Sequence, residues 1–281
     1  MRLKGIKRFH YARDVEEALS LLSAYQGRGA LLAGGVDLAR SARGDLEGLI
    51  DITGIGLSYV REDGGALRIG ATTTLTELLE SKGARDYLAG FLGEVLRQVA
   101  VTPLRNQATI GGAVVSAHPW ADIPTALVAL GAEVRWVGER EELAPVEELY
   151  RQRFRAIFRD AVLTEIRLPA WEGAFAFEKL VRSAYDIALL NCACGLGIED
   201  GKIAWARVAV GATPHRGRRL TWLEEALVGE APREELWSRV RGEVEAKVEV
   251  GTDRRASADW RRKVAGALIA RTLARAAERQ S

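Results

Sequence analysis

Apolar positions in the N-terminal part of the chain change from a helical spacing to a strand-like spacing. Within residues 15–22 they recur every three or four positions, which predicts an amphipathic helix that Asp14 can cap. A short apolar run at residues 30–33 then leads directly into Gly34-Gly35, and another run ends at Asp51. Short apolar runs bounded by glycine are typical of buried strands. The pattern therefore predicts a small layer of strands with one helix.

A hairpin and two helical segments are predicted next. Residues 57–69 have a hairpin pattern, with a glycine-containing turn at residues 61–65. Thr74 and Glu77 have the spacing of a capping box, in which a hydroxyl and a carboxylate accept hydrogen bonds from amides at the start of a helix. Helical periodicity resumes around residues 91–99.

The middle of the chain combines a glycine-rich break with a helix and two strands. The break lies at Ile110-Gly111-Gly112. Asp122 stands where a helix cap is expected, and Pro124 falls in the first turn of that helix. Residues 132–137 alternate as a strand does, and residues 162–168 form a further strand candidate.

A candidate domain boundary lies at residues 169–173, where proline and glycine interrupt the pattern. Beyond it, residues 174–180, 187–198 and 203–211 are predicted to be strands, the last two joined by an Asp200-Gly201 turn. Two or three helices close the chain. The last helix places its apolar and small residues on one face: Ala265, Leu268, Ile269, Thr272, Leu273 and Ala276.

Composition and charge argue against two classes of partner. The chain has 40 basic and 38 acidic residues, a net charge of +2 and a pI near 8.6, which is too mild for a nucleic-acid-binding protein. It contains neither an apolar run of membrane-spanning length nor a signal-peptide pattern. With 281 residues and 48% apolar composition it can bury a sizeable core, and a cytoplasmic location is the default expectation.

The cysteines and histidines do not predict a metal site. Cys192 and Cys194 are the only cysteines, and they alternate in a strand-like run. An iron–sulfur cluster as a rule needs four thiolates, so we expect small buried core residues, with a redox-sensitive pair as the alternative. The three histidines are too few and too scattered to form a metal site: His10, His118 and His215.

Two glycine loops are the candidate binding elements. In "LLAGGVDL", residues 31–38, two glycines follow a buried strand and let backbone amides approach a phosphate, although the same pair is also common in tight turns. The loop matches neither the dinucleotide fingerprint nor the P-loop. A second segment, residues 104–134, places small polar side chains beside Gly111-Gly112, an arrangement suited to a nucleotide. Within it, Asp122 is either a helix cap or a ligand-binding group, and His118 is a turn residue with an exposed imidazole.

These segments resemble the FAD-binding subunits of molybdenum hydroxylases of the xanthine dehydrogenase and carbon monoxide dehydrogenase type. The resemblance starts with "LLAGGVDL", "IGATTTLTEL" and "RNQATIGGAVVSAHPWADIPTALVALGAEV". It continues with "LTEIRLP", "FEKLVRSAYDIALL", "VGATPHRGRRLTWLEEALVG" and "ADWRRKVAGALIARTLARA". Order and spacing agree over nearly the whole chain, which is far more specific than either glycine loop.

The resemblance implies an α+β fold in two domains. Residues 1–170 would form a two-part FAD-binding domain of the vanillyl-alcohol-oxidase (PCMH) type. Residues 171–281 would form a smaller domain with a three-stranded antiparallel sheet and helices.

The resemblance also implies the site residues. The first diphosphate loop would consist of Leu32, Ala33, Gly34, Gly35, Val36, Asp37 and Leu38. The second would consist of Thr109, Gly111, Gly112 and Ser116. Asp122 would hold a sugar or phosphate-side hydroxyl, Leu163 would contact the adenine part, and Lys179 would approach the flavin end. One departure stands out, because Ala113 occupies the position where the family usually has asparagine.

In this family, electrons from a molybdopterin-binding large subunit pass through 2Fe–2S clusters of a small subunit to non-covalent FAD and then to an acceptor. The chain is accordingly expected to be an oxidoreductase subunit in a heteromeric complex, with no catalytic side chain of its own, and a dimer of heterotrimers is one assembly open to that complex. Two alternatives stay open. A free-standing FAD-dependent oxidoreductase would turn over alone, and a flavin-free assembly module would be colourless.

Overall fold

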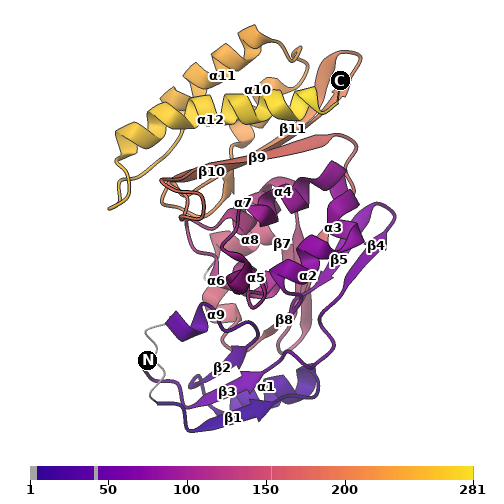
Figure 1. The fold of residues 1–281 in the computed structure, drawn as a ribbon, viewed down its shortest axis with the longest axis vertical. Coiled ribbons are helices and arrows are strands. Elements are labelled where there is room, and N and C mark those ends of the chain that lie inside the picture. Colours follow the sequence, from indigo (N-terminus) through magenta and orange to yellow (C-terminus); the bar gives the residue numbers. More distant parts are fainter. Residues whose placement is uncertain (1–4, 41–43, 153, 281) are drawn as a thin grey trace. The chain divides into compact units, whose positions relative to one another are not determined.

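The computed structural model describes residues 5–40, 44–152 and 154–280, drawn as a ribbon in Figure 1. They form two units, each discontinuous in sequence. Unit 1 comprises Met1–Gly83, Val101–Ser116 and Ala132–Leu168. Unit 2 comprises Ala84–Ala100, Ala117–Gly131 and Pro169–Ser281. The expected division at residues 170 and 171 stays a prediction, but two segments of the expected first domain pack within unit 2.

Unit 1 begins with a three-stranded parallel sheet in the order β1-β3-β2. Its strands are β1 (Arg8–Tyr11), β2 (Gly29–Leu32) and β3 (Gly48–Asp51). The helix α1 (Val15–Ala24) connects β1 to β2, since parallel strands need a crossover. Ala18 and Leu22 of α1 are buried against Ile50 and Ile52. The cap predicted at Asp14 is confirmed, because its carboxylate accepts the amide of Glu17 at 2.8 Å.

The second sheet of unit 1 is antiparallel throughout, in the order β4-β5-β8-β6-β7. Its strands are β4 (Val60–Asp63), β5 (Ala66–Gly70), β6 (Glu133–Val137), β7 (Glu141–Pro145) and β8 (Val162–Leu168). The short helices of this unit are α2 (Leu75–Glu80), α5 (Thr102–Arg105), α6 (Ile110–Ser116), α8 (Val146–Arg151) and α9 (Phe154–Ile157), with a 3₁₀ turn η1 (Leu38–Arg40). The chain passes into unit 2 through α3 (Lys82–Asp86).

Unit 2 is built on a four-stranded antiparallel sheet in the order β12-β11-β10-β9. Its strands are β9 (Ala174–Leu180), β10 (Leu190–Glu199), β11 (Lys202–Gly211) and β12 (Arg218–Arg219). The three predicted strands are present, and the two-residue β12 adds a short edge. β10 starts at Leu190 rather than Ile187, because the residues before it form a loop.

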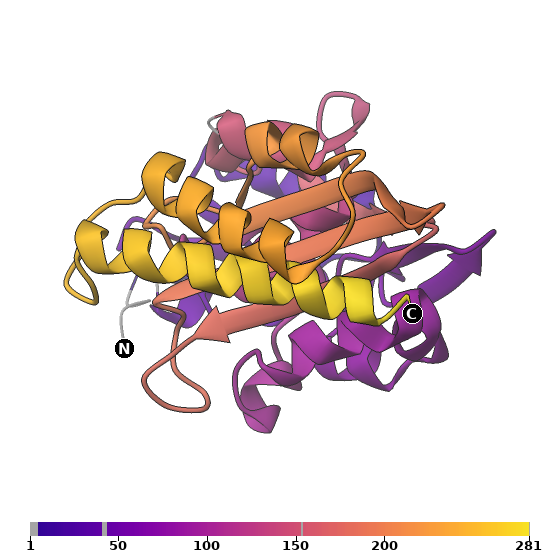
Figure 2. The same ribbon diagram turned by 90° about the horizontal axis from the view of Figure 1, so that it is seen from above.

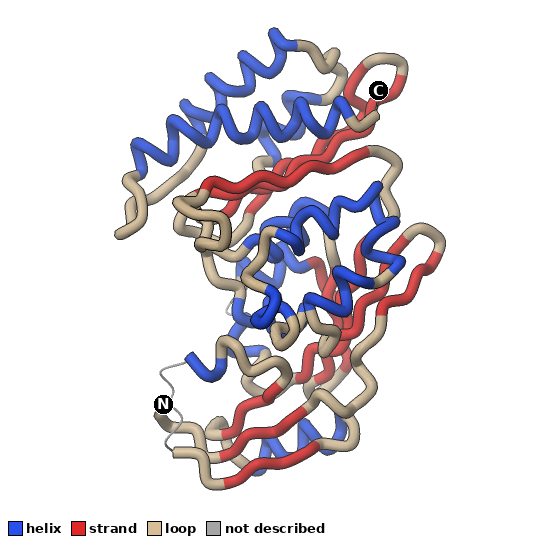
Figure 3. Tube along the Cα trace, viewed as in Figure 1, coloured by secondary structure: helices blue, strands red, loops and turns tan. Residues whose placement is uncertain are grey.

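Helices cover the sheet of unit 2 on both faces (Figures 1 and 3). One face carries α10 (Thr221–Leu227), α11 (Glu234–Lys247) and α12 (Ala258–Glu278), and Figure 2 shows α11 and α12 lying side by side across it. The other carries α4 (Phe91–Arg97), which follows the 3₁₀ turn η2 (Tyr87–Gly90), and α7 (Asp122–Leu130). The predicted apolar face of the last helix is confirmed, since all six of its residues are buried. Each large aliphatic side chain among them contributes about 2 kcal/mol by burial.

Close backbone approach lets α7 lie on the sheet. A Cβ added to Gly211 would lie 2.1 Å from Thr125 Oγ1, and one added to Gly217 would lie 2.6 Å from the Thr125 Cα. Arg207 of β11 fastens the other end of the helix by donating to the carbonyls of Ala129 and Val128 at 2.9 and 3.0 Å. These contacts make α7 part of unit 2.

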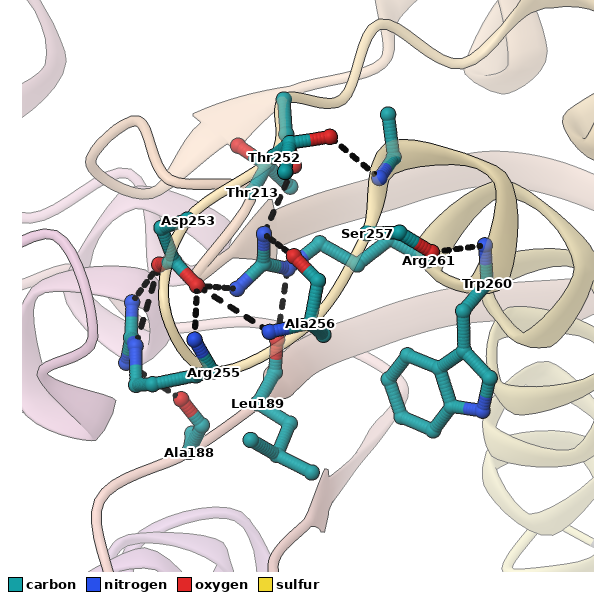
Figure 4. A network of polar contacts seen from close by, with 12 residues as sticks. Ala188, Leu189, Thr213, Thr252, Asp253, Arg255, Ala256, Ser257, Trp260 and Arg261 are labelled. Carbon is teal, nitrogen blue, oxygen red and sulfur yellow. Dashed lines mark hydrogen bonds and ion pairs between the residues drawn. The ribbon is translucent and has the colours of Figure 1, made fainter.

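A buried arginine holds the start of α12 (Figure 4). Arg261 is fully buried, and its guanidinium donates to Asp253 at 2.8 Å and to the carbonyls of Leu189 and Gly251 at 3.1 and 2.6 Å. Arg255 donates to the same carboxylate at 2.7 Å. Burial by itself raises the pKa of Asp253, but hydrogen bonds from the two arginines outweigh it and hold that pKa below its usual range.

Several elements were not anticipated from the sequence. The strands β1 and β7 and the short helices α3, α5, α6, α8 and α9 lack a long periodic pattern and are stabilised by their neighbours. The glycine-rich break predicted at Ile110-Gly111-Gly112 is wrong, because these residues begin the helix α6, where Gly111 packs on the Ala71 backbone. Among the described residues, no helix is both long enough and apolar enough to cross a membrane.

Candidate functional site

The first glycine loop leaves β2 in a conformation that only glycine adopts without strain. Gly35 has a φ of +70°, in the left-handed region. Within the described part of the chain, the amides of Gly34, Gly35 and Val36 donate no hydrogen bond to other residues. The turn is closed on its far side, where the Gly35 carbonyl accepts the Ala39 amide at 2.9 Å. Successive amides that lack partners can receive an anion.

The second glycine loop lies directly against the first. A Cβ on Gly34 would fall 1.8 Å from the carbonyl oxygen of Gln107, so the two loops touch through backbone atoms. A Cβ on Gly111 would fall 2.6 Å from the carbonyl oxygen of Ala71. Both glycines are required by this packing, and Gln107 is the contact that sequence reasoning missed.

Hydrogen bonds to α2 and within the loop fix the second loop. Thr109 forms a bridge with Thr74, and the Ile110 amide donates to the Thr73 carbonyl at 3.0 Å. The Thr109 hydroxyl accepts the Gly112 amide at 3.1 Å, and Ser116 donates its hydroxyl to the Ala113 carbonyl at 3.4 Å. Ala113 is half-buried on α6, where a methyl group stands in place of the asparagine amide usual in the family.

The remaining predicted site residues are distributed over both units. Leu163 is on β8 in unit 1, is 5% exposed, and pairs in register with Trp136. Asp122 and Lys179 lie in unit 2 and contact each other. Unit 1 therefore brings both glycine loops together, and unit 2 brings Asp122 and Lys179 together.

Asp122 does not cap its helix, so that interpretation is wrong. Ala121 is the cap residue of α7, and its helix makes no side-chain cap bond. The Asp122 carboxylate instead accepts from Lys179 Nζ at 2.9 Å and from Asn191 Nδ2 at 2.7 Å. Burial raises the pKa of Asp122, and the charge of Lys179 and the bond from Asn191 lower it by less. A polar residue inside the apolar run of β10 was the available signal for Asn191.

Lys179 retains capacity for a ligand. Its side chain is 5% exposed, and its ammonium donates to the Gln98 carbonyl at 2.5 Å and to Asp122. An ammonium has three N–H donors, so the described residues engage two of them.

The surroundings of the cysteines and of His118 indicate a role in packing and not in metal binding. Cys192 and Cys194 are buried in the core beneath α12, as predicted, and Cys192 Sγ lies 3.1 Å from Thr272 Oγ1. Burial raises the pKa of the Cys194 thiol. His118 lies in a turn, stacked on Trp120 with ring centroids 4.8 Å apart, and is half-buried rather than exposed. Across the described ranges, no group of three His, Cys, Asp or Glu residues could hold a metal ion.

The arrangement of unit 1 fits a dinucleotide diphosphate. Amides without partners line the first loop, and the absence of a Cβ at Gly34 lets its backbone approach that of the second loop at Gln107. The absence of a Cβ at Gly111 lets the second loop pack on the backbone of Ala71. Ala113 removes one polar side chain but leaves the backbone donors in place.

Two family models match the chain in succession. Residues 4–171 match the FAD binding domain in molybdopterin dehydrogenase, and residues 175–276 match the CO dehydrogenase flavoprotein C-terminal domain. Caffeine dehydrogenase subunit beta of Pseudomonas sp. (strain CBB1) is 30% identical over 287 residues, covering 96% of this chain and 95% of that protein. The carbon monoxide dehydrogenase medium chain of Afipia carboxidovorans is 31% identical over 286 residues, covering 96% of each.

A solved structure of a relative has the same fold. Carbon monoxide dehydrogenase from Hydrogenophaga pseudoflava, in a form lacking the Mo-pyranopterin moiety of its cofactor, matches with a TM-score of 0.90 at 29% identity and covers 98% of each chain. The predicted α+β class and FAD-binding architecture are confirmed. The chain therefore belongs to the family of FAD-binding medium subunits of molybdenum hydroxylases, and it is an oxidoreductase subunit of the carbon monoxide dehydrogenase type.

Proposed function

We propose that this chain passes electrons from 2Fe–2S clusters of a partner subunit, through non-covalently bound FAD, to a terminal acceptor. The contact of the two glycine loops in unit 1 carries the proposal. It places the unpartnered amides of Gly34, Gly35 and Val36 next to a second loop whose own conformation is fixed by Thr109.

Each predicted site residue has a role under this proposal. The first loop receives the diphosphate through backbone donors, and the second supplies the facing backbone around Gly111 and Gly112. Leu163 offers an apolar surface to the adenine part. Asp122 holds a sugar hydroxyl, and Lys179 uses its remaining donor toward the flavin end.

The proposed partner subunits supply the iron–sulfur clusters and the molybdopterin, for which this chain has too few cysteines or no recognised site. FAD, when bound, can exchange single electrons with an iron–sulfur centre and release one or two electrons to an acceptor. Two cysteines cannot ligate 2Fe–2S clusters, which as a rule need four thiolates each. We therefore assign the clusters to a small subunit and molybdopterin to a large subunit. A dimer of heterotrimers is one assembly that such subunits can form, and we propose the cytoplasm as the location of the complex.

Acid precipitation tests whether the flavin is held without a covalent bond. Purified chain loaded with FAD should release all flavin to the supernatant, because the proposed contacts are hydrogen bonds and packing. Flavin that stays in the pellet contradicts the proposal and makes His118 the first residue to examine. Failure of the folded chain to take up any FAD favours the assembly module instead.

A further inference from the structure

The chain makes an excursion between the two units at the second glycine loop. It leaves unit 2 after Ala100, contributes Val101–Ser116 to unit 1, and returns to unit 2 at Ala117. The residues that flank this excursion are Gln98 on one side and Asp122 on the other. Both belong to unit 2 and both contact the same side chain, Lys179 of β9.

The contact of Lys179 is short and buried, and both oxygens of the Asp122 carboxylate accept hydrogen bonds. Lys179 Nζ lies 2.5 Å from the Gln98 carbonyl oxygen and 2.9 Å from Asp122 Oδ2. The side chains of Lys179 and Asp122 are 5% and 8% exposed. Asn191 donates to the other carboxylate oxygen at 2.7 Å, and its own amide oxygen accepts from Thr125 at 3.0 Å. One ammonium therefore joins the chain segments on the two sides of the excursion, and it keeps one N–H donor for a ligand.

We propose that Lys179 is a positioning residue that ties together the chain segments before and after Val101–Ser116, at Gln98 and Asp122, and thereby presets the second glycine loop for its ligand. Bringing the ends of a segment together lowers the number of conformations open to it, so a tether at both ends restricts the loop before any ligand arrives. The buried ion pair makes the tether strong, because removal of one partner leaves an uncompensated charge.

The contacts of Lys179 with Gln98 and Asp122, called the tether below, are present in the FAD-free chain. Only their effect on FAD affinity rests on the proposed function. Amide hydrogen exchange of the FAD-free chain is therefore the deciding measurement. In Lys179→Met, exchange within residues 101–116 should rise about tenfold, while exchange in β10 and β11 changes little. Lys247→Met is the matched control, since Lys247 bonds Glu243 at 3.1 Å in the same unit but is 56% exposed and outside the network.

A second variant keeps the proposal testable if Lys179→Met does not fold. Asp122→Asn combined with Lys179→Met removes both charges, which buried pairs tolerate better than loss of one partner. It should show the same selective rise in exchange. If the double variant exchanges at the wild-type rate within residues 101–116, or if exchange rises equally in β10, Lys179 does not restrain this segment and the proposal is overturned.

FAD titration by flavin fluorescence then tests the consequence. The double variant should bind FAD about tenfold more weakly, and bound FAD should slow exchange within residues 101–116 again, because the loosened loop becomes ordered on binding. The proposed function also gives Asp122 and Lys179 direct contacts with FAD, so exchange that stays fast in the FAD-bound variant assigns the weaker binding to those lost contacts and overturns presetting. Faster exchange with unchanged FAD affinity overturns the presetting role. If the wild-type chain takes up no FAD, the proposed function fails, whereas the exchange experiment still decides the tether.

Discussion

Three glycines are the residues of this chain that say most about the candidate site. Gly34 and Gly111 matter because a single added carbon would collide with the backbone of Gln107 or Ala71. Gly35 is different, since an added Cβ would only meet Leu32 Cδ1 at 3.0 Å, the end of a flexible side chain. An added Cβ at Gly35 therefore meets no backbone atom, but the φ of +70° strains any residue other than glycine, aspartate less than most.

Gly35→Asp should abolish most FAD binding without unfolding the chain. The variant places a carboxylate beside the proposed diphosphate, and the repulsion of two unit charges a few ångströms apart is about 1–4 kcal/mol, which lowers affinity by about fivefold to nearly a thousandfold. Flavin content and circular dichroism check this. Gly56→Asp is the matched control, since Gly56 has a φ of +79° in unit 1 with nothing within 4 Å. Unchanged flavin content in folded Gly35→Asp would exclude the first loop as the diphosphate site.

Asp253 makes stability depend on pH. Because its pKa is lower in the folded chain than the ordinary value of 3.8, the carboxylate stabilises the fold fully above that value and progressively less as pH falls below it. Asp253→Asn leaves the fully buried Arg261 uncompensated and should cost about 3 kcal/mol at neutral pH.

Urea unfolding of wild type and Asp253→Asn at pH 7 and pH 3 measures this effect. The difference in unfolding free energy between the two proteins should narrow at pH 3, where the unfolded wild-type chain binds a proton at residue 253. A difference that stays constant or grows at low pH would show that the ion cluster does not set the acid response.

At the scale of elements, α2 links a local sequence signal to the site. Thr74 and Glu77 form the predicted capping box, with the Thr74 hydroxyl accepting the Glu77 amide at 3.1 Å and the Glu77 carboxylate accepting the Thr74 amide at 2.8 Å. The same end of α2 holds the second loop, because the Leu75 amide donates to the Ala108 carbonyl at 2.8 Å. A change at the cap therefore acts on both helix and loop.

Thr74→Ala should lower the unfolding free energy by about 1 kcal/mol, the usual cost of losing a helix cap. It should also weaken FAD binding slightly, because loss of the cap loosens the start of α2 and with it the backbone bridge between Thr74 and Thr109. Thr221→Ala is the control, since Thr221 starts α10 exposed and its helix has no side-chain cap bond; a change within about 0.5 kcal/mol is expected. Equal effects in the two variants, measured by urea unfolding, would contradict the role of the cap.

At the scale of the whole molecule, the proposed function requires electrons to enter from outside the chain. In stopped-flow absorbance, the isolated FAD-loaded chain should show negligible flavin reduction by a substrate of the assembled complex. Reduction should appear once the large and small subunits are both added. Rapid bleaching of the flavin in the isolated chain by the substrate would contradict the proposed electron transfer from partner subunits. It would favour a free-standing oxidoreductase instead.

The sequence by itself determined the elements with strong local patterns. The strands β3, β8 and β9 and the apolar face of α12 follow from apolar spacing, because side-chain direction repeats every two residues in a strand and about every 3.6 in a helix. The glycine loops and the family resemblance also follow from local motifs. These features depend on residues close together in the chain.

Only the tertiary structure decided which distant residues meet. The short strands β1, β7 and β12 exist because a neighbouring strand completes their hydrogen bonds, and no local pattern specifies that neighbour. Likewise, nothing in the local pattern of Asp122 distinguished a helix cap from a partner of Lys179 and Asn191. The approach of Gly34 to Gln107 is of the same kind, since a contact between backbones depends on how both loops are held and not on the residue types within either.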